Sequence, residues 1–230
     1  VIYSRVRLVR NLKEYPFPGR LTKEQSAELS EKLLGGLTGI ASMDRMQYRF
    51  THLERMGDLE KTALLERRAI NRSVIKKKVP TGMILSEDES TAILLNGDDH
   101  VRIQTLQTGL TLEQLYERAD KIDDYISERF DYAFDEKYGY LTSFPTNVGT
   151  GLRAAVVLHL PMLSKNKNFN SLVADMGRFG AQVRGVYGEG AENFGSLYQI
   201  SNQKTLGQTE REIIDIVRKA AQELDAQERR

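Results

Sequence analysis

The residues of this sequence that are best suited to chemistry are five arginines that stand in predicted strands or beside turns. Arg5 and Arg7 fall in a predicted N-terminal strand, where alternation places both on one face. Arg102, Arg153 and Arg184 lie next to acidic or glycine-rich turns. A planar guanidinium binds two phosphate oxygens at once, so five converging arginines predict a polyphosphate site. For each arginine taken alone, the alternative is a salt bridge on a solvated sheet face.

The segment at residues 142–154 has the composition of an anion-binding turn. It holds one proline, two glycines, four hydroxyl side chains and Arg153. Glycines let a backbone approach a ligand closely, and hydroxyl, amide and guanidinium groups all donate to phosphate oxygens. We therefore expect a turn that cradles an anion.

Carboxylates stand close to these arginines in the sequence, at Asp98, Asp99 and Glu189. Carboxylates do not help to bind a polyphosphate directly, but they can hold a cationic acceptor or a magnesium ion. Gly188 and Gly190 flank Glu189, so we expect a mobile loop that closes over a ligand. A plain surface hairpin is the alternative for this loop.

The rest of the sequence predicts a sheet and long helices that position these residues. Hydroxyl residues followed three positions later by Glu or Gln predict capped helix starts at Thr22, Thr111 and Thr209. A further helix is expected over residues 59–70, and a polar turn at residues 86–90 predicts an antiparallel hairpin. These patterns favour an α+β fold with a largely antiparallel β-sheet flanked by helices. The predicted strands cover residues 1–8, 47–53, 82–86, 92–96, 100–107, 154–160, 182–187 and 197–201.

Composition excludes several classes of protein. The 230 residues contain no cysteine, which excludes disulfides, zinc–thiolate sites and thiol catalysis and is consistent with a reducing cytoplasm. A net charge of +1 gives no support to direct nucleic-acid binding. No apolar run approaches the roughly 20 residues of a membrane span, and no signal peptide is visible. We expect one domain over residues 1–230, and a fragment of a longer protein, because the chain opens inside a strand and ends in a charged helix.

Five motifs, in order along the chain, resemble those of one known family, the ATP:guanido phosphotransferases or phosphagen kinases. The run Val-Tyr-Gly-Glu-Gly that begins at Val186 is similar to the protein arginine kinase branch of this family. Metabolite kinases have an arginine where Tyr187 stands. The five motifs cover residues 4–12, 96–104, 139–153, 184–190 and 199–207.

This resemblance implies a catalytic domain of the glutamine synthetase/guanido kinase type, in which MgATP lies on the sheet. Family members use two acidic residues to hold and deprotonate the acceptor guanidinium, and these match Asp98 and Glu189. Phe144 stands on the acceptor side. We expect no protein side chain to hold the metal, and Mg²⁺ to be held mainly through the nucleotide phosphates. The ATP-binding positions of the family match Ser4, Arg5, Val6, Arg7, Arg68, Arg102, Arg153, Ala154, Ala155, Val156, Val157, Arg184, Gly185, Val186, Tyr187, Gly188 and Glu189.

The chemistry of the acceptor explains why carboxylates are needed. A free guanidinium has a pKa above about 12 and no lone pair to spare, so it is a poor nucleophile. A carboxylate on each side aligns it and accepts a proton as the N–P bond forms. Arginines and Mg²⁺ neutralise charge on the transferring phosphoryl group.

Several positions depart from the family pattern. Where the family reads Asn-Glu-Glu-Asp-His, this chain has Gly97 for the first glutamate and Asp98 for the second. The shorter side chain retracts the carboxylate by roughly 1.5 Å, and a misplacement of about 1 Å can cost about 100-fold in rate. Phe144 replaces a cysteine, Arg68 a nucleotide-contacting histidine and Arg72 a proline. Nucleotide binding is therefore better preserved than catalysis.

We predict an enzyme, a protein arginine kinase that transfers the γ-phosphoryl group of MgATP to arginine side chains of proteins. The alternatives are a weak or inactive nucleotide-binding pseudokinase of the same family and a kinase of a small free guanidine. The resemblance further implies a C-terminal dimerisation domain outside these residues and a homodimeric full-length protein. It also implies links to the Clp protease machinery and to a stress-response repressor. We expect a cytoplasmic protein with no direct nucleic-acid or membrane partner.

Overall fold

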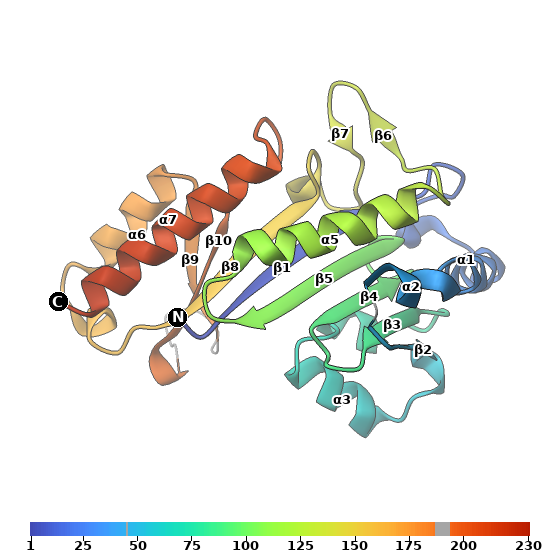
Figure 1. Cartoon of the computed structure of the whole chain (residues 1–230), viewed down its shortest axis with the longest axis horizontal. Helices are drawn as coiled ribbons and strands as arrows, with labels where there is room; N and C mark the ends of the chain where they lie inside the picture. The colour runs from blue at the N-terminus through green and yellow to red at the C-terminus, as the bar shows by residue number, and fades with distance from the viewer. Residues whose placement is uncertain (45, 187–193) are drawn as a thin grey trace.

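One large antiparallel sheet forms the centre of the protein (Figure 1). This computed structural model describes residues 1–44, 46–186 and 194–230. Eight strands lie in the order β2–β3–β4–β5–β1–β8–β10–β9, and each is antiparallel to its neighbours. A separate hairpin is formed by β6 and β7. The strands are β1 (Tyr3–Arg10), β2 (Tyr48–His52), β3 (Gly82–Ser86), β4 (Thr91–Leu95), β5 (Val101–Thr108), β6 (Phe134–Asp135), β7 (Gly139–Tyr140), β8 (Leu152–His159), β9 (Ala181–Gly185) and β10 (Leu197–Asn202).

Helices α5 and α7 lie across one face of this sheet (Figure 1), and their apolar residues build the main core. Residues Leu115, Ala119 and Ile122 of α5 repeat at helical spacing and are fully or almost fully buried. Helices α1 and α6 extend the same core toward the two ends of the sheet. The helices are α1 (Lys23–Gly36), α2 (Ala41–Asp44), α3 (Asp58–Glu66), α4 (Arg72–Ile75), α5 (Leu112–Ser127), α6 (Phe169–Arg178) and α7 (Glu210–Glu228).

The opposite face of the central strands carries the polar residues. Along β1, Val6 and Leu8 pack into the helix-covered core. Because successive side chains of a strand point to opposite faces, Arg5 and Arg7 lie on the other face. The same alternation holds for β5, β8, β9 and β10, so one face of the sheet is apolar and the other is rich in arginine and glutamine.

A second, smaller apolar cluster covers this other face at the β2–β3–β4 end. It joins residues of α3 and α4 to the strand residues Met83, Leu85 and Leu94. Helix α3 accordingly lies on the far side of the sheet from α1 (Figure 1). This cluster places α4 beside the turn between β4 and β5.

The sequence predicted the fold class correctly: the sheet is antiparallel and flanked by helices. The hairpin around residues 86–90 is also confirmed, as β3 pairs with β4. Capping boxes at Thr22 and Thr209 are present. None of the helices in the described ranges combines the length and the apolar composition that a membrane crossing requires.

Two local predictions were wrong. Thr111 precedes α5, but its side chain accepts no capping hydrogen bond. Its backbone N–H donates instead to the Ser4 hydroxyl at 3.1 Å, which removes the donor that a capping box needs. The helix expected over residues 59–70 ends at Glu66, because Arg68 adopts a left-handed φ of 63° that no α-helix accommodates.

Candidate active site

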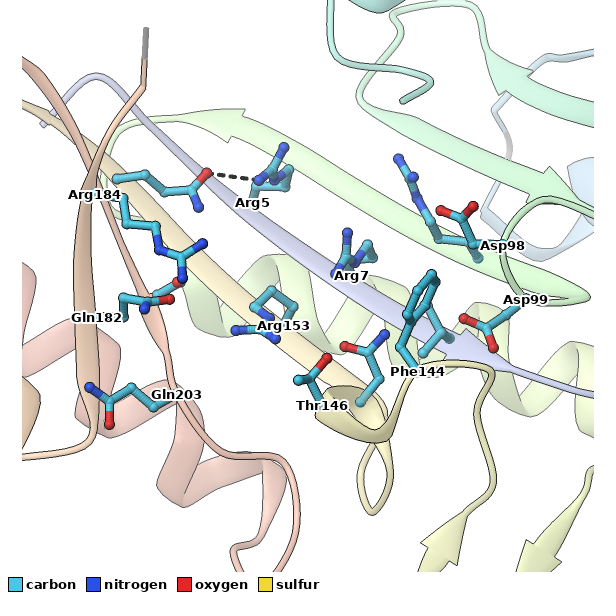
Figure 2. Close-up of a pocket in the computed structure, with 15 residues that line it drawn as sticks. Arg5, Arg7, Asp98, Asp99, Phe144, Thr146, Arg153, Gln182, Arg184 and Gln203 are labelled. Carbon is cyan, nitrogen blue, oxygen red and sulfur yellow. Dashed lines mark hydrogen bonds between the residues drawn. The ribbon is translucent and has the colours of Figure 1, made fainter. Parts of the chain in front are cut away.

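A cavity of about 630 Å³ lies on the arginine-rich face of the sheet. Figure 2 shows side chains from several strands pointing into the same space. Asp98, Asp99 and Phe144 lie at one end, and Arg184 lies at the other. The lining residues are Arg5, Arg7, Val9, Asp98, Asp99, Arg102, Phe144, Thr146, Asn147, Arg153, Gln182, Arg184, Gln199, Ser201 and Gln203.

Strand register brings these arginines together from distant parts of the chain. Arg7 on β1 lies opposite Arg153 on β8, and Val9 lies opposite Arg102 on β5. On the far edge, Arg184 of β9 is paired with Gln199 of β10. The five predicted phosphate-binding arginines therefore all line one cavity, as the sequence predicted they would converge.

Few carbonyl or amide groups satisfy the arginines. Arg5 donates from Nη2 to Gln199 Oε1 at 2.8 Å, and Arg153 donates from Nη1 to the carbonyl of Asn202 at 2.7 Å. Buried nitrogens of Arg7 and Arg102 have no hydrogen-bond partner. Within the described ranges, no carboxylate forms an ion pair with any of the five cavity arginines. The cavity is thus a positively charged site with buried donors on Arg7 and Arg102 that make no hydrogen bond within the protein.

Burial and mutual repulsion both act on these guanidinium groups. Burial, followed by the charges of Arg102, Arg5 and Arg153, lowers the pKa of Arg7 to about 9, while Asp99 acts in the opposite direction. Burial likewise lowers the pKa of Arg102 to about 10, with Arg5 contributing in the same direction. The pKa of Arg153 is lowered by burial and then by Arg184. A polyanion in the cavity would relieve this unfavourable charging.

The acidic end of the cavity is formed by the turn between β4 and β5. Asp98 accepts hydrogen bonds from Asn71 Nδ2 and Ser73 Oγ, both at 2.7 Å. Asp99 is almost fully buried, and its Oδ1 accepts from Asn11 Nδ2 and from the backbone N–H of Ser143, both at 2.7 Å. Both carboxylates line the cavity, so negative charge is concentrated at one end and positive charge over the rest.

His100, which immediately precedes β5, has a structural role. Its Nδ1 accepts from the backbone N–H of Leu12 at 2.9 Å, and its Nε2 lies 3.0 Å from the carbonyl of Pro16, which assigns the neutral Nε2–H tautomer. Burial lowers the pKa of His100 to about 4. The backbone N–H of His100 donates to Asn11 Oδ1, so Asn11 links this histidine to Asp99.

The glycines of residues 142–154 are required by the chain itself. Gly149 has a φ of 110°, and a Cβ there would lie 2.3 Å from the carbonyl oxygen of Thr205. Gly151 has a φ of 66°, and its Cβ would meet the carbonyl of Val9 at 2.6 Å. The sequence predicted that these glycines let the backbone approach a ligand closely. In the structure, they let it approach the backbone of neighbouring segments, at Thr205 and Val9. The segment contributes Phe144, Thr146, Asn147 and Arg153 to the cavity.

Some predicted ATP-binding residues are not brought to the cavity by their side chains. Val6, Ala154 and Val156 pack into the helix-covered core. Ser4 is fully buried and donates to the carbonyl of Gly109 at 2.7 Å. These side chains point away from the cavity because side chains alternate along β1 and β8, and these positions face the helix-covered side of the sheet.

The remaining predicted residues fall into three groups. Ala155 and Val157 share the cavity face with Arg153 by alternation, but do not line the cavity. Arg68 lies close enough to lower the pKa of Arg5, without lining the cavity. Gly185 ends β9 and Val186 follows it. The others, Tyr187, Gly188 and the predicted catalytic Glu189, lie outside the described residues.

Sequence reasoning did not name several polar residues of the cavity as site residues. Gln182 stands two positions before Arg184, and Gln199, Ser201 and Gln203 alternate along β10 and just beyond it. Strand alternation beside a known arginine was a signal that would have found them. Asp99 was among the carboxylates that the sequence singled out, and Thr146 and Asn147 belong to the predicted anion-binding turn, but none of the three was given a role of its own because loop side chains follow no such period.

Comparison with known proteins places the chain in a family. Residues 31–230 match the family described as ATP:guanido phosphotransferase, C-terminal catalytic domain. A protein named protein-arginine kinase, from Caldanaerobacter subterraneus subsp. tengcongensis, is 42% identical over 231 residues, which cover 100% of this chain and 68% of the relative. Further curated relatives of that name are 38–43% identical, and the chain spans 62–68% of the length of these relatives. The chain therefore belongs to the ATP:guanido phosphotransferase family.

Solved structures agree with this assignment. Lombricine kinase superposes with a TM-score of 0.87 at 24% identity, over 100% of this chain and 66% of that chain, which supports the fold. The duplicated taurocyamine kinase from Schistosoma mansoni, solved with bound transition state analog components, has a TM-score of 0.87 at 28% identity. That match covers 99% of this chain and 32% of the other.

Proposed function

We propose that this chain is the catalytic domain of a protein arginine kinase, which transfers the γ-phosphoryl group of MgATP to arginine side chains of proteins. The observation that carries the proposal is a cavity with five arginines, none paired with a described carboxylate, and with two carboxylates at one end. The family supplies the reaction class, and the name shared by the curated relatives supports the protein acceptor.

The arginines of the cavity suit the nucleotide. Arg5, Arg7, Arg102, Arg153 and Arg184 would bind the phosphates and neutralise charge on the transferring group, which is where most of the catalysis arises in phosphoryl transfer. The sheet register fixes the backbone positions of Arg5, Arg7, Arg102, Arg153 and Arg184 beside one another.

The acidic end suits the acceptor. A guanidinium entering beside Phe144 would meet the carboxylate of Asp98, which aligns it and takes its proton as the N–P bond forms and the bond to ADP breaks. We propose Glu189, which lies outside the described residues, as the second carboxylate. For transfer to occur, the reacting nitrogen, the γ-phosphorus and the leaving oxygen of ADP must be in line, and the two carboxylates would hold the guanidinium in that position.

Mg²⁺ would supply further charge neutralisation on the β- and γ-phosphoryl oxygens when bound. Among the described residues, no three His, Cys, Asp or Glu side chains are grouped so that they could hold a metal ion. From the resemblance to the family, we propose that the ion is held mainly through the phosphates, with the cavity arginines holding the phosphates in turn.

The test is transfer of labelled γ-phosphate from MgATP to an arginine-rich protein, scored as acid-labile and base-stable label. Parent protein, Glu189→Ala and a Lys76→Met control are compared, with ATP binding measured separately for each. Label from the parent and the control, and none from Glu189→Ala, is expected. Intact ATP binding without any label would instead favour the pseudokinase, for which Gly97 and Asp98 are the specific observation.

A small free guanidine is the other alternative acceptor. The lombricine and taurocyamine kinases share the fold but are 24–28% identical, whereas the protein-arginine kinases are 38–43% identical. Free arginine and creatine added as acceptors in the same assay should therefore receive no label while the protein does. The reverse result would reassign the acceptor.

The setting of this activity is also a proposal. We propose cytoplasmic protein substrates with exposed arginines, a homodimeric full-length protein, and a role in stress response through the Clp protease machinery and a stress-response repressor. These proposals rest on the resemblance to protein arginine kinases. Sedimentation of the full-length protein and capture of labelled Clp components test them separately from the reaction.

A further inference from the structure

The carboxylate of Asp98 is held by side chains of a segment that the proposed mechanism does not use. Asn71 Nδ2 donates to its Oδ2 and Ser73 Oγ donates to its Oδ1, each at 2.7 Å. With one donor on each oxygen, the plane and the direction of the carboxylate are both fixed. Each oxygen keeps a lone pair, so a guanidinium still has acceptors to meet.

Asn71 contacts a distant segment through its side chain and does not cap its own helix. It occupies the residue before α4, where the side-chain oxygen of asparagine commonly accepts from the helix backbone. The helix start has no side-chain capping hydrogen bond, and Asn71 Oδ1 has no hydrogen-bond partner. Asn71 Nδ2 donates to Asp98, 27 residues away in sequence. A purely local role for Asn71 in helix formation is therefore not what the geometry supports.

Lys77 holds the backbone of the same turn. Its Nζ donates to the carbonyl oxygens of Asn96 at 2.6 Å and Gly97 at 2.5 Å. The turn needs this support because Asn96 adopts a left-handed φ of 54°. Burial lowers the pKa of Lys77, and the negative charge of Asp98 acts in the opposite direction.

Gly97 permits this close packing. A Cβ at position 97 would lie 2.7 Å from Leu94 Cδ2 and 3.7 Å from Val74 Cγ2. Val74 is a buried residue of α4 and packs with Leu94 in the second apolar cluster. A larger side chain at 97 would require Leu94 to shift, whereas Val74 of α4 would be in ordinary van der Waals contact with it. Gly97 therefore lets the turn that carries Asp98 pack directly on Leu94.

We propose that Asn71, Ser73 and Lys77 are positioning residues that hold the shortened carboxylate of Asp98 in line with the acceptor. This inference rests on the proposed function and names the parts that let an aspartate serve where the family pattern has a glutamate. The site is accordingly matched to aspartate, and lengthening residue 98 drives its carboxylate past the donors at 71 and 73.

The kinetic test compares parent protein with Asn71→Ala/Ser73→Ala, using MgATP and an arginine-rich acceptor protein. We expect kcat to fall about 10- to 100-fold, since small misplacements of a reacting group have effects of that size. The KM for MgATP should stay within about twofold. Ser73→Thr keeps the hydroxyl and should retain kcat near the parent value, and Asp98→Glu should not exceed it.

Unchanged kcat in the double variant, or a faster Asp98→Glu enzyme, would overturn the proposal. A KM for MgATP that rises together with the loss of kcat would also do so, because it would indicate general damage to the cavity. Thermal denaturation of each variant identifies any that fail to fold. If the double variant fails to fold, the kcat of Ser73→Thr is compared with that of the parent instead.

A second arm does not require turnover. Amide hydrogen exchange over residues 95–99 should quicken in Lys77→Met and stay at the parent rate in the matched control Lys76→Met, since Lys76 is exposed. Equal exchange in both variants would overturn the role of Lys77. If the parent transfers no phosphate, the proposed function fails, and the exchange result alone decides whether this segment holds the turn.

Discussion

Arg7 on β1 and Arg153 on β8 are cross-strand partners, with like charges facing each other over the floor of the cavity. Like charges directly opposite one another destabilise a sheet. No described carboxylate pairs with either of them, and a buried nitrogen of Arg7 has no hydrogen-bond partner. The repulsion between Arg7 and Arg153 therefore destabilises the protein without nucleotide, and a bound anion would reduce this repulsion. Such a loss of stability is common where residues serve ligand binding.

Arg7→Met should accordingly raise the stability of the nucleotide-free protein, by on the order of 1–2 kcal/mol, because it removes a poorly compensated charge and keeps the packing. The same variant should lose the rise in Tm that MgATP gives the parent. Thermal denaturation with and without MgATP measures both effects. Arg211→Met is the control, since Arg211 is exposed and lies outside the cavity.

The pH dependence of this effect has a definite sign. Burial lowers the pKa of Arg7 from 12.5 to about 9, so above pH 9 the unfolded chain holds the proton that the folded protein loses. Stability from this group therefore rises with pH above about 9. The advantage of Arg7→Met over the parent should shrink between pH 8 and pH 10. An advantage that grows over this range would contradict the assignment.

The buried pair of Arg10 and Asp123 should be the most costly ion pair to break. Arg10 Nε and Nη2 donate to Asp123 Oδ2 at 3.0 and 2.6 Å, and Arg10 Nη1 also holds the carbonyl of Thr150 at 2.9 Å. Asp123→Asn leaves a buried guanidinium without its counter-charge, which costs about 3–5 kcal/mol. Urea unfolding measures the loss. The exposed pair Arg178–Asp175 is the control, and Arg178→Ala should cost less than about 1 kcal/mol.

Gly151→Ala should destabilise the protein and weaken MgATP binding together. A Cβ at this position meets the carbonyl of Val9 at 2.6 Å and requires a φ of 66°, and such strain costs about 1–3 kcal/mol. The displaced turn leads directly into Arg153. Gly19→Ala is the matched control, because nothing lies within 4 Å of its Cβ, and its effect should stay within about 0.5 kcal/mol. Equal effects of the two substitutions would mean that the turn adapts freely.

The sequence was sufficient to predict the cavity wherever a strand period applied. Arg5 and Arg7 share a face because the side-chain period of a strand is two, and register then brings Arg153 opposite Arg7. Loops gave no such period. The helix end at Arg68 and the missing cap at Thr111 depend on contacts with Gln104 and Ser4, which are distant in sequence.

The link between Asn71 and Asp98 shows the same limit at the candidate site. An asparagine before a short helix indicates a cap, and local propensity alone gives no reason to turn its amide toward another segment. The contact arises because Val74 packs on Leu94 and so sets α4 over the β4–β5 turn. Local chemistry thus predicted which arginines line the cavity, whereas three-dimensional packing decides how the carboxylate of Asp98 is oriented.

His100 should make the protein sensitive to mild acid. Burial lowers its pKa from 6.5 to about 4, and protonation of Nδ1 would break the hydrogen bond from the backbone N–H of Leu12. Between pH 6.5 and pH 4 the unfolded chain binds more protons than the folded protein, so stability falls as the pH falls through this window. The difference in pKa corresponds to about 3 kcal/mol over the full window.

His100→Asn tests this coupling, because asparagine keeps an acceptor for the Leu12 N–H and does not titrate. The variant should lose some stability at pH 7 through poorer packing, yet show a shallower decline in the free energy of unfolding between pH 6.5 and pH 4. His159→Asn, at an exposed position, should keep the parent slope. Urea unfolding at four pH values measures the slopes. A parent-like slope in His100→Asn would contradict the assignment of the acid sensitivity to His100.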